Sequence, residues 1–289
     1  MAESKIPVDL FNPGQVFACL GFMELADVLL GDAEAAFDWS DAAQSYFHLL
    51  TAGDKAPVKV VLDFLETATL NPVSPLGADG PWPPNATASE VFPSPLSELL
   101  KSNKKGYSAS NLPFVIRNNA HEICISSWLE GDGRRALKLF AGQQVAVQLM
   151  INVLTGDENK PGTQGVRQLC PPDDDPFQVG PVGGRFGYDS RGAWDAINVG
   201  SSLDEQGVVL LISPVVESLS VIGLEFARPE FLSTYEIRYA VWQGRLPASL
   251  ARVAFTQPDK FAPHSNYRYF HSHLGDDKQY KKCFSAQEK

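Results

Sequence analysis

The 289-residue chain has few cysteines, no long apolar run and no excess of positive charge. Its four cysteines are widely spaced without a CxxC pair, so we expect free thiols and no disulfide framework. No apolar segment approaches the roughly 20 residues that span a bilayer, and residues 1–15 lack the apolar block of a signal peptide. These absences predict a cytoplasmic protein that makes no membrane contact.

The net charge of -10 argues against a protein that binds nucleic acid on its own. The charge is uneven, however: residues 101–150 hold 7 basic and 3 acidic residues, and residues 251–289 hold 7 basic and 4 acidic ones. Ordinary surface variation is the simpler explanation. The alternative is a basic strip that contacts phosphates inside a complex whose other subunits carry most of the positive charge.

Apolar periodicity and helix-start residues predict an α+β fold. The clearest element is a helix of about 18 residues that begins with Pro13 after the N-cap Asn12 and ends before Gly31. Ser213 and Pro214 repeat this start for a helix through 224. We also expect helices over 57–65, 94–101 and 143–154, and strands over 6–10, 37–39, 46–50, 113–117, 121–128, 136–140, 208–212, 235–242 and 267–271.

Two long loops interrupt this pattern. Residues 71–95 are rich in proline, and residues 157–184 combine glycine, proline and the acidic run 173–175. Loops of this length are often functional. The charged tail after Gly275 is expected to fray.

No residue pattern matches a known catalytic motif. His271, His273 and Cys283 lack the spacing of a common zinc site and a fourth ligand, so exposed histidines are the simpler interpretation. The aspartates 173–175 could attract a divalent cation, but adjacent side chains point in different directions, which favours an acidic surface loop. The His-Glu pair at 121–122 forms no HExxH motif, and no GxSxG elbow is present. We predict no catalytic residue, no metal and no cofactor.

The segment 180–187 is rich in glycine and contains Arg185 and Phe186. It lacks the GxGxxG and P-loop patterns, but arginine, an aromatic ring and mobile backbone together suit stacking on single-stranded nucleic acid. The alternative is a loop that only turns the chain. In a second basic cluster, 134–138, phosphate contact competes with an ordinary solvated loop. The candidate nucleic-acid-binding residues are Lys101, Lys104, Lys105, Arg134, Arg135, Lys138, Arg185 and Arg191.

Several segments, taken in order, resemble one protein family. They are 6–26 (IPVDLFNPGQVFACLGFMELA), 186–189 (FGYD), 193–196 (AWDA), 214–217 (PVVE), 222–224 (IGL), 228–229 (RP), 239–242 (YAVW), 246–247 (LP) and 251–252 (AR). Over about residues 5–255 the chain resembles the small Csb/Csx-type subunits of type I-U (I-G) CRISPR–Cas systems. The matching pieces are apolar residues with glycine and proline, and none is a catalytic signature.

This resemblance implies a RAMP-like fold: ferredoxin-like (RRM-like) strand-helix-strand units with long loop insertions. They would form a single α+β domain over 1–289, which can also be divided into two RRM-like halves, about 1–156 and 185–272, joined by the loop 157–184. It further implies a non-catalytic subunit of a crRNA-guided, Cascade-like interference complex in antiviral defence. Its partners would be other effector subunits and crRNA or target DNA, contacted directly or through protein.

The acidic balance departs from a typical RNA-holding subunit and favours a peripheral or protein-bridging place. Two other functions stay open. One is a metal-dependent or hydrolytic enzyme that uses the glycine-rich loop with Asp189 or His121. The other is a protein-binding adaptor without nucleic-acid contact.

Overall fold

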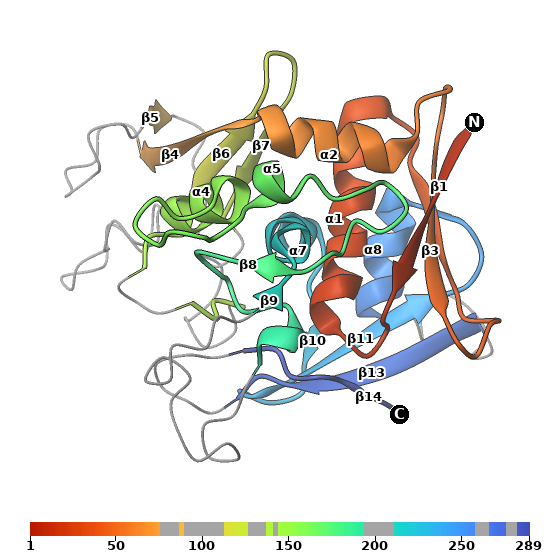
Figure 1. Ribbon diagram of the computed structural model, residues 1–289. Helices are drawn as coiled ribbons and strands as arrows, with labels where there is room; N and C mark the ends of the chain where they lie inside the picture. Colours follow the sequence, from red (N-terminus) through yellow and green to blue (C-terminus); the bar gives the residue numbers. More distant parts are fainter. Residues whose placement is uncertain are drawn as a thin grey trace.

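The computed structural model describes residues 1–75, 87–89, 113–126, 137–140, 144–193, 211–257, 266–275 and 282–289. Within these ranges the protein has six α-helices and several small, mostly antiparallel sheets (Figure 1), which confirms the α+β class. The helix expected over 94–101 lies outside the described residues.

Helix α1 (Pro13–Leu30) begins and ends where the sequence predicts. The side chain of Asn12 accepts a hydrogen bond from the Gly14 N–H at 3.1 Å, and the Gly31 N–H donates to the Asp27 carbonyl at 2.9 Å. By length and composition α1 could cross a membrane, yet most of it is buried inside the protein. Apolar side chains lie on every side of its first 14 residues, which are all buried by surrounding protein.

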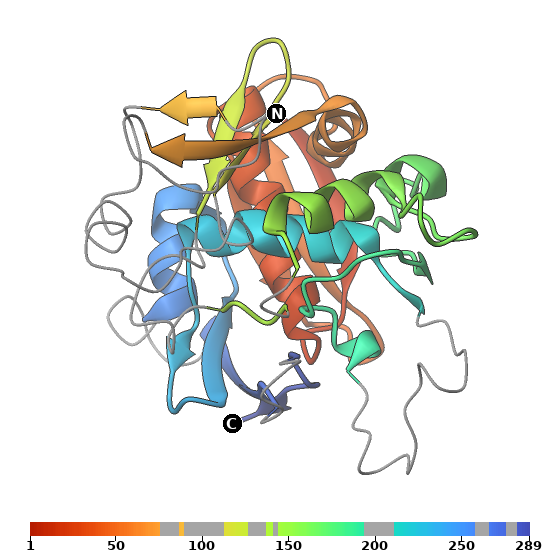
Figure 2. The same ribbon diagram turned by 90° about the vertical axis from the view of Figure 1, so that its left-hand side faces the viewer.

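Helix α7 (Pro214–Phe226) packs directly on α1 at the centre of the molecule (Figures 1 and 2). Glycine makes this close approach possible. A Cβ atom on Gly21 would lie 2.1 Å from the Leu219 carbonyl oxygen, and one on Gly223 would lie 2.3 Å from the Phe17 carbonyl oxygen. Both distances are far below van der Waals contact, so any larger residue would push the two helices apart.

The N-terminal strands form an antiparallel sheet in the order β1-β3-β2-β12. Helix α1 connects β1 to β2, and α2 follows β3. Side chains of this sheet alternate between the core and the surface, as the two-residue period of a strand requires. The elements are β1 (Ala2–Val8), β2 (Glu34–Asp38), β3 (Ser45–Thr51), β12 (Leu246–Pro247) and α2 (Pro57–Thr67).

The C-terminal strands form a second antiparallel sheet in the order β10-β11-β13-β14. Helix α8 packs on β11. Cys283 and Ala286 are buried and β14 pairs with β13, so the expectation of a frayed tail is wrong for the last eight residues. The elements are β10 (Glu230–Phe231), β11 (Glu236–Trp242), β13 (Tyr267–His273), β14 (Gln287–Glu288) and α8 (Ala248–Thr256).

A third sheet has the order β5-β4-β6-β7, and β8 pairs with β9. The hairpin of β6 and β7 around the two asparagines at 118–119 is confirmed. The strand expected over 136–140 is wrong for residues 137–140, and residues 71–75 of β4 lie in a segment expected to be loop. The elements are β4 (Thr69–Pro75), β5 (Thr87–Ser89), β6 (Phe114–Arg117), β7 (Glu122–Ile125), α4 (Ala146–Thr155), α5 (Val166–Leu169), β8 (Gly180–Pro181), η3 (Ser190–Gly192) and β9 (Leu211–Ile212).

One hydrophobic cluster joins these layers, with members from Ile6 to Ala286. The four cysteines are free, as expected. Cys19 and Cys283 lie in the core, and burial raises the pKa of both thiols. They therefore act as small apolar side chains.

We predict that Gly223→Ala lowers the free energy of unfolding by about 3 kcal/mol, because the new methyl group overlaps the α1 backbone. Urea denaturation followed by circular dichroism measures this change. The matched control is Gly162→Ala, which has open space around it and only a positive φ, and should cost about 1–2 kcal/mol. Without the close contact, alanine would stabilise the helix by about 1 kcal/mol, so a stabilised Gly223→Ala variant would contradict the packing.

Candidate nucleic-acid interface

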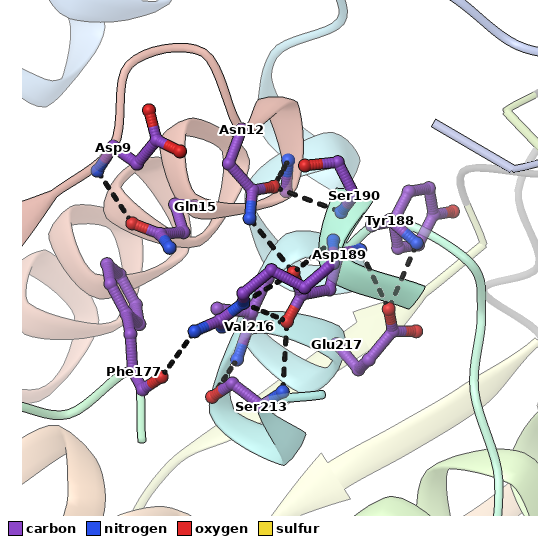
Figure 3. A network of polar contacts seen from close by, with 12 residues as sticks. Asp9, Asn12, Gln15, Phe177, Tyr188, Asp189, Ser190, Ser213, Val216 and Glu217 are labelled. Atoms are coloured by element: carbon purple, nitrogen blue, oxygen red, sulfur yellow. Dashed lines mark hydrogen bonds and ion pairs between the residues drawn. The ribbon is translucent and has the colours of Figure 1, made fainter. Parts of the chain in front are cut away.

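The glycine-rich segment predicted to meet a ligand continues into the core, where it runs between the N-termini of α1 and α7 (Figure 3). Phe186 and Tyr188 are each 1% exposed. The backbone of this loop touches α1, because a Cβ on Gly14 would lie 2.5 Å from the Tyr188 carbonyl oxygen. Residues 186–189 therefore form part of the protein interior.

The carboxylate of Glu217, in the first turn of α7, holds this loop in place. It accepts hydrogen bonds from four consecutive backbone N–H groups: Phe186, Gly187 at 2.9 Å, Tyr188 at 3.0 Å and Asp189 at 2.9 Å. Burial raises the pKa of Glu217 and the nearby Asp189 charge adds to the rise, while the backbone N–H groups of Asp189, Gly187 and Phe186 favour the ionised form and oppose it. The loop thus binds an anion as a glycine-rich loop can, but the anion is the protein's own side chain.

Asp189 connects the same loop to both helix caps. Its buried carboxylate accepts from the Asn12 Nδ2 and from the Ser213 backbone N–H, both at 2.9 Å. Arg191 Nη2 lies 2.7 Å from Asp189 Oδ2, and its Nη1 donates to the Phe177 carbonyl at 3.1 Å. Asp189, considered as a catalytic group, is therefore buried and paired with Arg191, predicted to contact nucleic acid, whose side chain stays 33% exposed.

The other described candidates are also held by protein groups. Arg185 Nη1 donates to the Gly192 carbonyl at 3.1 Å. Lys138 Nζ lies 4.7 Å from the centre of the Phe140 ring, and burial lowers its pKa. The remaining candidates lie outside the described residues: Lys101, Lys104, Lys105, Arg134 and Arg135.

The potential metal ligands do not come together. Within the described ranges, no group of three or more His, Cys, Asp or Glu side chains is placed to hold a metal ion. Cys283 is buried, whereas His273 is exposed. The aspartates 173–175 are all exposed, as expected of a solvated acidic loop.

Sequence reasoning missed the outer face of the C-terminal sheet. On β13, Phe270 and Ser272 point into the core and are at most 3% exposed. By alternation, Tyr269, His271 and His273 share the opposite face, and we call these three side chains the ring row. The spacing of aromatic and histidine residues at every second position in 267–273 was the signal that could have found it.

Charged groups surround the ring row. Arg238 on β11 stands opposite His271, and its guanidinium carbon lies 5.2 Å from the Tyr269 ring centre. Burial lowers the pKa of His271, and the nearby cations Lys289 and Arg238 lower it further. Two nearby carboxylates, Glu236 and Glu230, act in the other direction and raise this pKa. The lowered pKa favours the neutral form of the His271 ring.

Two further rings extend the row at its His273 end. The His273 ring centre lies 6.4 Å from that of Tyr235 and 6.2 Å from that of Phe284. Such rings can stack on bases, and cations beside them can pair with phosphates.

No protein-family model, curated protein or solved structure matches the chain.

We predict that Glu217→Gln lowers the free energy of unfolding by about 2–6 kcal/mol. Its amide NH2 would face two backbone N–H groups, and each buried donor left without an acceptor costs about 1–3 kcal/mol. Urea denaturation measures the loss. Glu158→Gln, at an exposed carboxylate, should change stability by less than about 0.5 kcal/mol; equal stability of the two variants would refute the role assigned to Glu217.

Proposed function

We propose that this chain is a non-catalytic subunit of a crRNA-guided, Cascade-like CRISPR complex that acts in antiviral defence. The observation that carries the proposal is the strand order β1-β3-β2, with α1 between β1 and β2 and α2 after β3. This is the arrangement of the first five elements of a ferredoxin-like unit, the building block of the RAMP proteins that the sequence resembles.

The unit departs from a complete ferredoxin-like fold at its sixth element. There the strand after α2 would pair with the open edge of β1, whereas β4 pairs with β5 and β6 instead. Among the described residues, β3 is the sole partner of β1. The proposed fold is thus a ferredoxin-like unit whose last strand has moved to a neighbouring sheet.

A scaffolding role fits the chemistry of the glycine-rich loop better than the enzyme alternative does. Asp189 already has five hydrogen-bond donors, from Asn12, Ser213 and Arg191. A general base or metal ligand needs a free lone pair directed at its substrate. Such an interior supports a rigid subunit that positions surfaces for other effector subunits and for crRNA or target DNA.

Co-expression with the other effector subunits and a crRNA, followed by size exclusion, tests this proposal. We predict that the chain elutes with the RNA-containing complex, and that omission of the crRNA reduces this co-elution. If the remaining subunits assemble on the crRNA while this chain elutes alone, the proposal is wrong. A stoichiometric metal in the purified protein would favour the metal-dependent enzyme instead.

A further inference from the structure

We infer that the outer face of the β10-β11-β13-β14 sheet binds single-stranded nucleic acid by stacking bases on the ring row. The inference rests on the proposed function, because it takes nucleic acid as the ligand. It further specifies which surface binds and that the bound nucleic acid is single-stranded. Figure 1 places these strands at one end of the molecule, with α1 and α8 on their inner side. None of the described helices covers the outer side (Figures 1 and 2).

The geometry of the ring row suits bases. Alternate residues of a strand are about 7 Å apart, which is twice the 3.4 Å step of a stacked nucleic-acid strand. One base can therefore lie against each ring of Tyr269, His271 and His273. The lowered pKa of His271 favours its neutral form, and a neutral ring can stack without the cost of removing water from a charged group.

Two cations beside the ring row can meet phosphates. Lys289 and Arg238 both lie near His271, and the carboxylates of Glu236 and Glu230 lie near it as well. Arg238 pairs with Glu230, but both side chains are substantially exposed, at 33% and 42%. Arg238 Nε also donates to Glu230 at 2.7 Å, so a phosphate must compete with the glutamate for this partly exposed guanidinium.

A single strand fits this face better than a duplex does. In a duplex the faces of the bases are stacked on one another and cannot reach protein rings, whereas an unpaired strand exposes them. The backbone N–H groups of the loop at 186–189 do not bind phosphate in this arrangement, because they already donate to the Glu217 carboxylate.

Fluorescence anisotropy on the full chain tests the inference, with labelled single-stranded RNA and DNA 20-mers and the matching DNA duplex at low salt. We expect the wild-type chain to prefer both single strands over the duplex. Tyr269→Ala and His271→Ala should each weaken single-strand binding roughly fivefold to a hundredfold, the range that follows from losing one stacked base. His271→Phe, which keeps a flat ring, should restore most of the affinity.

Tyr46→Ala is the matched control. Tyr46 lies on β3 of the other sheet and also stacks with a cation, Lys5, whose Nζ is 3.6 Å from its ring centre. This variant should bind like the wild type, and circular dichroism should show that all variants are folded.

Several results would overturn the inference. They are no binding by the wild-type chain, equal affinity of the ring-row variants and the wild type, or a preference for the duplex. If the ring-row variants bind oligonucleotides normally but lose the other subunits in co-expression, the face is a protein contact. In each case co-elution of the wild-type chain with the crRNA complex would still support the proposed function. The inference about the sheet face can therefore fail while the proposed function stands.

Discussion

The fold depends on one buried carboxylate and the four backbone donors that it satisfies. Glu217 holds residues 186–189 against the start of α7, and Asp189 at the end of that stretch bonds to Asn12 and Ser213, the caps of α1 and α7. Removing any member would leave polar groups without partners in the core, where each costs about 1–3 kcal/mol. The network therefore fixes where the two central helices begin.

This constraint also decides where function can reside. In the sequence, a glycine-rich loop, an aspartate and an arginine resemble a ligand site. In the structure, the loop donates hydrogen bonds to Glu217 and the arginine donates to the aspartate. The interior is rigid, with glycines at 21 and 223 holding the helices in contact, so the surface is where we propose that binding occurs. On the described surface, the outer face of the C-terminal sheet brings rings together with the cations Arg238 and Lys289 and with two glutamates.

Local signals made much of the fold predictable. The caps Asn12 and Ser213, each followed by proline, located α1 and α7 almost to the residue, because a helix start is encoded by neighbouring residues. The role of Glu217 was not predictable, since its partners lie 28 to 31 residues away in the chain. The pairings of β14 with β13 and of β4 with β6 depend equally on distant segments.

Amide hydrogen exchange on the full chain, with and without a single-stranded RNA, tests most directly the claim that the loop is structural and the sheet face functional. The account predicts slow exchange at residues 186–189 in both states, because their N–H groups donate to a buried carboxylate. It predicts that added RNA slows exchange in β13. Rapid exchange at 186–189 that becomes slow only when RNA is added would contradict the account and would restore the loop as the binding site.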